Sequence, residues 1–473
     1  MTTRSMELAV ALTNLAPPVF SPAAIGKAKL CLLDFLGCAF EASELEPSQQ
    51  AVSAVSAAPG GHMIGESATA TPADAAFVNA VKGHGLVRED MHAASVCHHG
   101  VVVWPLLLAL AETDTVSGMD LLRSAVVAYE VGGRLGRMLI DPTLSSLFRP
   151  TGLVAPIGSA CGGAWMLKLG PQQIEAAIAL AANTASGLNQ WPQSGGSDMF
   201  FHPGFAVRNA WMAVRLAESG AFGSPDILEG RSGYFAALAR RPMPGRIELF
   251  PNGEADIFNV YHKAAPACNF AQTACQTALK LVEMIGSDAA PVERIRISVP
   301  AAAAAYPGCD RTGPFDRALQ AKMSIPFGVG AVFAHGRLSE DIYSNLADPE
   351  TLRLISVSEL IASPDLTALF PGQQGAAINV VLGDGRQLSM GLPDVVPATE
   401  AQVRERFRLA AASTLGVADA EAIEEFVDRL DTKKDASRLL SLCAAKRVAR
   451  RQATRTPAQG AGKRTRLSSR QSL

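Results

Sequence analysis

The sequence is poor in aromatic and charged residues, and it lacks long apolar runs. Phe, Trp and Tyr make up 6% of the 473 residues, and Asp, Glu, Lys and Arg make up 18%. No run approaches the roughly 18 uninterrupted apolar residues of a membrane-spanning helix. The first residues, MTTRSMELAVALTNLA, contain a single Arg and lead to two prolines, a pattern too weak for a secretory signal. We expect a globular protein with no membrane partner.

Paired cysteine motifs are also lacking. The eight cysteines are scattered, with no CxxC and no paired metal-ligand spacing, at positions 31, 38, 97, 161, 268, 275, 309 and 443. Most have apolar neighbours, where a free cysteine behaves as a small hydrophobic residue. The sequence therefore predicts neither a disulfide framework nor a cysteine metal site, and it favours the cytoplasm.

Basic charge is concentrated in the C-terminal tail. Residues 446–473 contain nine Lys and Arg and no acid, although the whole chain has a formal charge of −2, so the body of the chain is acidic. The tail is poor in apolar residues, and we expect it to be disordered. A basic tail can indicate nucleic-acid binding, but the aromatic residues and fold signatures that would support this are missing. A nucleic-acid partner is not expected.

Apolar residues recur at helical spacing through the first 240 residues, with almost no alternation of period two. Abundant alanine, and glycines at 132, 133 and 136, favour close helix packing. Ser21 followed by Pro22 is a typical helix start. We predict helices at 5–16, 21–39, 72–84, 101–112, 119–138, 151–169, 171–188 and 205–219, and a loop at 189–204.

The pattern changes after about residue 257. Residues 292–299 (VERIRISV) alternate apolar and charged side chains, as a half-buried strand does. Two strands at 377–382 and 386–390 flank Gly383-Asp384-Gly385, which predicts a tight turn. Helices are expected between these strands, near 269–283 and 318–335, and again at 399–415 and 419–429. The fold class is therefore mostly α: a large all-helical domain (1–262), an inserted α+β domain (263–398), and C-terminal helices (399–445) that pack back on the first domain.

Residues 83–112 (GHGLVREDMHAASVCHHGVVVWPLLLALAE) hold the densest group of side chains able to move a proton near neutral pH. His92, His98 and His99 follow Glu89 and Asp90 in a short loop, and a buried apolar helix comes directly after. We regard this loop as the candidate site of chemistry. The alternative is that these histidines are solvated or structural.

Several segments of the sequence, in their order and spacing, resemble the MmgE/PrpD family. Its members include 2-methylcitrate dehydratase, cis-aconitate decarboxylase and iminodisuccinate epimerase. The resemblance covers about residues 20–400. Its blocks are AKLCLLDFLGC, DAAFVNAVKGHGL, HHGVVVWPLLLALAE, AYEVGGRLG, PTGLVAPIGSACGGAWMLKLG, HPGFAVRNAWMAVRLAESGAFGSPDILEG and KAAPACNF.

The resemblance implies that the α+β domain is a lid, that the protein is a homodimer, and that the active site lies in the cleft between the domains. It also implies chemistry without a metal or organic cofactor. Members of the family move a proton at a carbon next to a carboxylate, then lose water or carbon dioxide, or return the proton to the other face. Such a reaction needs a base, an acid and cations that hold the carboxylates.

Around the His-rich loop the family pattern is only partly kept. Where the family typically has Asp-Phe-Asp-Asp-Thr-His, this chain reads VREDMH, so the first acid and the Thr are replaced while Asp90 and His92 remain. The family's next histidine aligns with His98, seven residues before Pro105. The resemblance therefore carries Asp90, His92 and His98 over as catalytic candidates.

Elsewhere the match is uneven. Lys263 retains a family lysine and is the fourth catalytic candidate. His202 retains a family histidine. Arg149 replaces a catalytic histidine, and the remaining candidate substrate-binding residues replace Lys, His and Tyr in the family: Met199, Cys268 and Phe327. Arg149 and Lys263 are the candidate carboxylate clamps, since Arg suits bidentate binding of a carboxylate.

These replacements make the pocket more apolar than a tricarboxylate requires, because fewer charges remain to compensate its carboxylates. We expect a lyase or isomerase that dehydrates, decarboxylates or epimerises a small, relatively apolar carboxylic acid. His98 is the expected base or acid, with its pKa tuned by Asp90 or Glu89. Two alternatives stay open: a biosynthetic isomerase or cyclase with a bulkier substrate, and a homologue that has lost its chemistry and serves a binding role.

Overall fold

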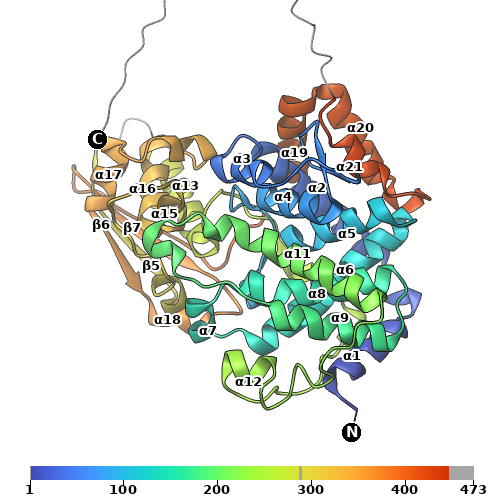
Figure 1. Cartoon of the computed structure of the whole chain (residues 1–473). Helices are drawn as coiled ribbons and strands as arrows, with labels where there is room; N and C mark the ends of the chain where they lie inside the picture. Colours follow the sequence, from blue (N-terminus) through green and yellow to red (C-terminus); the bar gives the residue numbers. More distant parts are fainter. Residues whose placement is uncertain (1, 287–289, 447–473) are drawn as a thin grey trace, which may run out of the picture.

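The computed structural model describes residues 2–286 and 290–446 and is shown in Figure 1. The predicted basic tail at 446–473 therefore lies outside the described residues, except for Lys446. The described residues form a mostly α-helical fold with few strands, which confirms the predicted fold class. None of the described helices combines the length and the apolar character that crossing a membrane requires.

Nearly all of the regular secondary structure in the first 250 residues is helical. The two-residue strands β1 (Gly61–His62) and β2 (Thr69–Ala70) pair with each other, and β3 (Met91–His92) follows. The longer helices are α1 (Arg4–Thr13), α2 (Pro22–Glu41), α3 (Glu46–Ser53), α4 (Pro72–His84), α5 (Gly100–Thr113), α6 (Gly118–Leu139), α8 (Pro150–Met166), α9 (Pro171–Thr184) and α11 (Asp198–Glu218). Short helices α7 (Pro142–Leu147), α10 (Trp191–Ser194) and α12 (Tyr234–Ala239) lie between or after them.

Local chemistry explains where these helices begin and how closely they pack. Ser21 caps α2 by accepting a hydrogen bond from the Ala24 amide at 3.2 Å, as its position before Pro22 predicted. Helices α6 and α8 cross so closely that a Cβ atom at Gly158 would lie 2.6 Å from the Ala128 carbonyl oxygen. The glycine-rich stretches of both helices are what permits this contact.

A four-stranded sheet forms the second part of the structure, with strand order β6-β5-β7-β8. Strands β5 (Val292–Val299), β7 (Ala376–Leu382) and β8 (Gln387–Leu392) were predicted from the sequence within one or two residues, and they pair antiparallel. Strand β6 (Ser358–Ala362) was missed; it pairs parallel to β5 at the edge of the sheet, where its side chains show no clear alternation of burial. The accompanying helices are α13 (Gln272–Ile285), α14 (Ala301–Ala304), α15 (Ala318–Met323), α16 (Ile325–His335), α17 (Pro349–Ser356) and α18 (Pro364–Leu369).

The last helices lie beside the first ones. In Figure 1, α19 (Glu400–Leu415), α20 (Val417–Asp428) and α21 (Arg438–Leu442), in red, flank the blue α2 on the side away from the sheet. Phe407 of α19 is fully buried, and its ring lies 6.3 Å from that of Phe40 in α2. The sequence predicted this return to the helical part. The domain boundaries at 262, 398 and 445 and the lid role stay predictions.

Two helix predictions were wrong. Residues 189–204 were expected to be a loop, but α11 already begins at Asp198 and continues past Pro203, because Met199 and Phe200 are buried in the interior. Residues 318–335 were expected to form one helix, but Ser324 interrupts it. The Ser324 hydroxyl accepts the Phe327 amide hydrogen bond at 3.0 Å and so caps α16, with Pro326 in its first turn.

Candidate active site

The loop between α4 and α5 carries the candidate chemistry and is held by two kinds of constraint. Strand β3 pairs with β4 (Val260–Tyr261), which brings the chain before Lys263 against this loop. Val87 and Val96 have φ angles of 57° and 49°. β-Branched residues rarely adopt this left-handed conformation, and such strain persists only where the surroundings impose it.

The carboxylate of Glu89 lies between two histidines. Its Oε1 atom is 2.5 Å from Nδ1 of His84 and 3.0 Å from Nδ1 of His98, and the two imidazole centroids are 5.4 Å apart. All three side chains are almost completely buried. We call these three residues the Glu89 cluster.

Hydrogen-bond partners assign the protons of the cluster. Nδ1 of His98 is also 3.0 Å from the Asp90 carbonyl oxygen, which can only accept, so Nδ1 carries the proton and Nε2 of neutral His98 is a free base. Nε2 of His84 lies 3.0 Å from a guanidinium nitrogen of Arg149, which can only donate. His84 is therefore neutral with its proton on Nδ1, and its second nitrogen is already occupied. Within the cluster, His98 is therefore the residue whose unprotonated ring nitrogen has no hydrogen-bond partner among the described residues.

The pKa values follow from burial and from these contacts. Burial lowers the pKa of His98 to about 4, and the opposing effect of Glu89 is smaller. Burial also lowers the pKa of His84. Burial by itself raises the pKa of Glu89, but interactions with His84 and His98 outweigh it and hold that pKa well below its ordinary value. At neutral pH the cluster therefore consists of an ionised Glu89 and two neutral imidazoles.

Two buried cations stand beside the cluster. Arg149 comes immediately before α8, packs 5.4 Å from the Trp191 ring, and keeps a buried Nε atom without a partner among the described residues. Lys263 is completely buried and donates to the Val87 carbonyl oxygen. Burial lowers the pKa of Lys263 to about 8, although Glu89 works against this effect. Both side chains carry N–H groups of the kind that pair with carboxylates.

Asp90 lies outside the Glu89 cluster. Its Oδ1 atom accepts the Gly100 amide at the start of α5 at 3.1 Å, and its Oδ2 atom accepts the Tyr129 hydroxyl. Burial raises the pKa of Asp90 to about 6, against the hydrogen bond from Tyr129. The structure thus places Asp90 at a helix N-terminus, and Glu89 beside His98.

His92 is also separated from the cluster. Its Nε2 atom lies 3.1 Å from Oδ2 of Asp256, and its Nδ1 atom accepts the Ser95 amide at 3.2 Å. Arg137 forms a second ion pair with Asp256 at 3.0 Å. Because both nitrogens of His92 are occupied, its side chain offers no free base.

The four remaining candidates lie in different surroundings. Met199 Sδ is 2.9 Å from Nε2 of His84. His202, from the same helix, lies near Arg149, and burial lowers its pKa to about 4. Cys268 Sγ is 3.7 Å from Sγ of Cys309. The hydrogen bond from Cys309, followed by the nearby Lys263, brings the pKa of Cys268 to about 7 despite its burial.

Phe327 packs among apolar side chains. Its ring lies 5.1 Å from Phe315 and stacks on Tyr343 at 5.8 Å, and its role in substrate binding stays a prediction.

Two parts of the site were missed or left open by the sequence. From the sequence, His84 was predicted only as the last residue of a helix and not as a site residue. The segment GHGLVRE does place it five residues before Glu89, with a glycine between them. Glu89 was one of two acids suggested for tuning His98, and nothing in the sequence shows which of the adjacent acids points toward the imidazole.

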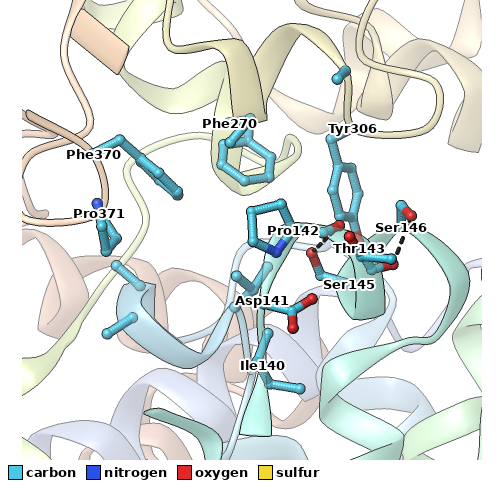
Figure 2. A pocket seen from close by; sticks show the side chains of 15 residues that line it. Ile140, Asp141, Pro142, Thr143, Ser145, Ser146, Phe270, Tyr306, Phe370 and Pro371 are labelled. Atoms are coloured by element: carbon cyan, nitrogen blue, oxygen red, sulfur yellow. Dashed lines mark hydrogen bonds between the residues drawn. The ribbon is translucent and has the colours of Figure 1, made fainter. Parts of the chain in front are cut away.

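A cavity of about 520 Å³ opens next to the site (Figure 2). Its walls include Val96 from the His-rich loop and Phe270, Tyr306 and Phe370 from the α+β part. The residues that follow α6 and those of α7 also contribute: 140–143, 145 and 146. Val96 and Phe270 each stand two residues from a site residue, His98 and Cys268 respectively. In the described part of the chain, no group of three or more His, Cys, Asp or Glu side chains is arranged to hold a metal ion.

Comparison with known proteins gives a consistent result over both parts of the chain. Residues 6–246 match the MmgE/PrpD N-terminal domain, and residues 265–432 match the MmgE/PrpD C-terminal domain. A cis-aconitate decarboxylase-like protein of Aspergillus oryzae is 27% identical over 92% of this chain and 96% of its own length. The mitochondrial 2-methylcitrate dehydratase of Yarrowia lipolytica is 26% identical over 88% of each chain. The human cis-aconitate decarboxylase is 31% identical over 36% of this chain and 35% of its own.

The position of Asp90 predicts a specific pH dependence of stability. Because the folded-state pKa is about 6, above the ordinary value of 3.8, the folded protein keeps a proton that the unfolded chain releases between these pH values. The contribution of Asp90 to the free energy of unfolding therefore decreases as pH rises from 4 to 6. In Asp90→Asn, the free energy of unfolding relative to the wild type is expected to rise by about 2 kcal/mol between pH 4 and pH 7. Urea titrations at several pH values measure this difference, and parallel pH profiles would contradict the assignment.

Proposed function

The chain belongs to the MmgE/PrpD family, and we propose that this lyase-type enzyme uses His98 as the base that removes a proton from carbon next to a substrate carboxylate. The observation that carries the proposal is the Glu89 cluster: Nδ1 of His98 donates to the Asp90 carbonyl oxygen with the Glu89 carboxylate 3.0 Å away, and Nε2 is left unprotonated. The ionised Glu89 would also stabilise the imidazolium that forms when His98 takes a proton.

Arg149 and Lys263 are proposed to hold the carboxylate and to stabilise the negative charge that develops when the proton leaves. Arg149 has a buried Nε without a protein partner in the described residues, and Lys263 has a single protein acceptor at its amine. Preorganised cations in a buried site are effective because little water screens them.

The charge balance favours a substrate with few carboxylates. With both imidazoles neutral, Arg149 and Lys263 contribute two positive charges and Glu89 one negative charge, and any ionisation of Cys268 would add a second negative charge. The nearby cations Arg88 and Lys322 have their own partners, Glu41 at 2.5 Å and Glu340 at 2.8 Å. A tricarboxylate would therefore bring two uncompensated charges into a buried site, at a large desolvation cost. We propose a carboxylic acid with fewer charges.

Loss of the proton leaves an electron pair on carbon, and three outcomes balance the reaction. The pair can expel a neighbouring hydroxyl group as water, or the proton can return to the other face. In the third outcome the proton first returns to the substrate at another carbon; a substrate carboxylate then leaves as carbon dioxide, its bonding pair stays on carbon, and one proton adds to that pair. Cys268, with a pKa of about 7, is a candidate proton donor beside Lys263. The names of the relatives support a dehydration or a decarboxylation for this chain.

The expectations of a cofactor-independent reaction, a homodimer and a cytoplasmic location rest on the resemblance and the composition, and they stay predictions. The isomerase or cyclase alternative would use the same base and the same cations. The alternative of a purely binding homologue is disfavoured by the retention of a complete base, carboxylate and cation arrangement.

Hydrogen exchange tests the proposed role of His98. The wild-type protein in heavy water is expected to incorporate deuterium next to the carboxylate of at least one acid from a panel of small mono- and dicarboxylates, measured by NMR. In His98→Asn, the exchange rate is expected to fall by at least about 100-fold, as for loss of a general base.

His335→Asn provides the matched control, because His335 lies at the end of α16 and pairs only with Asp348 and Thr351. It is expected to retain wild-type exchange. Exchange by His98→Asn at the wild-type rate would refute the assignment of the base.

The pH profile tests both ionisations. A base works when deprotonated, so kcat/KM is expected to rise with pH through about 4 as His98 loses its proton. A carboxylate clamp works when charged, so kcat/KM is expected to fall above about 8 as Lys263 becomes neutral.

Lys263→Arg is expected to move the alkaline limb to higher pH, because Arg stays protonated there. Cys268→Ser is the control, since the thiol has a pKa of about 7. An alkaline limb that vanishes in Cys268→Ser but remains in Lys263→Arg would contradict the role of Lys263.

A further inference from the structure

The cavity of Figure 2 gathers aromatic side chains in a chain that has few of them. The ring of Phe270 lies 5.1 Å from that of Tyr306 and 6.0 Å from that of Phe370, so three aromatic residues form one continuous wall. Pro142 and Ile140 face them from the helical part. A volume of about 520 Å³ lies within the range of small-molecule sites and is large enough for a ring-bearing group.

The polar groups in the walls of the cavity are used by the protein itself. The Asp141 carboxylate caps α7 by accepting the Leu144 amide at 2.8 Å. The hydroxyls of Ser145 and Ser146 donate to the carbonyl oxygens of Pro142 and Thr143, at 3.2 and 2.7 Å. These groups contribute little to binding a charged ligand, and the cavity therefore suits an apolar one.

Hydrogen bonds connect the cavity to Arg149. Phe148 and Leu188 form an isolated β-bridge, and the Arg149 amide donates to the Gly187 carbonyl oxygen at 2.9 Å. The pairing places Arg149 opposite Gly187 and Asn189 opposite Leu147, whose carbonyl oxygen accepts the Asn189 amide at 2.9 Å, so both residues belong to the same short antiparallel pair. The amide nitrogen of the Asn189 side chain in turn lies 3.3 Å from the Tyr306 hydroxyl and 2.9 Å from the Ser145 carbonyl oxygen.

Two buried polar atoms along this connection have no partner in the described residues: Nε of Arg149 and Oδ1 of Asn189. Unpaired buried polar atoms are costly, and a bound ligand is one way to satisfy them. The first is a donor suited to a carboxylate, and it lies on the side of the Glu89 cluster. The apolar cavity lies on the other side of Asn189.

We propose that the substrate is a carboxylic acid with an apolar, ring-sized substituent: Arg149 binds the carboxylate, and the substituent occupies the cavity beside Tyr306, Phe270 and Phe370. This inference rests on the proposed function, because it takes Arg149 as the carboxylate clamp. The inference specifies the chemical class of the substrate. It also explains how a site with few charges can select one carboxylic acid over others. The apolar group provides binding energy that a second or third carboxylate would otherwise provide.

The test compares two probes by calorimetry, propanoate and 3-phenylpropanoate. The wild-type protein is expected to bind 3-phenylpropanoate about 10- to 100-fold more tightly. Ala302→Phe, which fills part of the cavity, is expected to abolish this preference without weakening propanoate binding. Ala301→Phe is the matched control, because Ala301 is the neighbouring half-buried alanine of α14 but does not line the cavity. It is expected to keep the preference.

Thermal unfolding verifies that both variants are folded. Equal affinities of the wild type for the two probes, or a preference that survives in a folded Ala302→Phe, would overturn the inference. If propanoate binds and exchanges deuterium but the phenyl group adds nothing, only this inference fails and the proposed function stands. If neither probe binds, the inference fails together with the carboxylate clamp.

Discussion

The site depends on a single buried carboxylate that two imidazoles share. Glu89 is almost fully removed from water, and an isolated charge in such a place would be protonated or would destabilise the fold. The fold supplies the N–H of His84, at the end of α4, to one of its oxygens, and it places Nδ1 of His98, just before α5, 3.0 Å from the same oxygen. The geometry of the α4–α5 loop, including the strained Val87 and Val96, serves to bring these three side chains together.

Separate ion pairs surround the cluster and keep the other charged groups out of it. Asp90 is bound to Tyr129 and the start of α5, and His92 is bound to Asp256. Arg88 and Lys322 pair with acids on other segments. Among the charged or basic groups near the cluster in the described residues, the atoms left available are Nε2 of His98, Nδ1 of His202, Nε of Arg149 and the amine of Lys263. Of the histidines in the loop itself, His98 is thus the one left as a candidate base beside two cations.

The sequence predicted much of the fold and only part of the site geometry. Periodicity identified the helices and three of the four strands in the main sheet, because each of these elements buries one side or all of its surface. The edge strand β6 lacks such a pattern, and Pro203 hid the start of α11. In the site, His98, Arg149 and Lys263 could be identified as candidates from the sequence. The choice between Glu89 and Asp90 could not, because adjacent side chains of an irregular loop point in directions set by tertiary contacts, here by Tyr129 and His84. Phe327 likewise aligned with the site but packs against Tyr343, a partner distant in sequence.

The most direct measurement is the protonation state of the His98 ring, read from ¹⁵N NMR spectra of protein labelled at histidine. The His98 signals are assigned by their absence in His98→Asn. At pH 7 the account predicts a neutral ring with a protonated Nδ1 and an unprotonated Nε2, and it predicts that Glu89→Gln disturbs this tautomer. An imidazolium, or a proton on Nε2 in the wild-type protein, would contradict the claim that Glu89 holds His98 ready to act as a base.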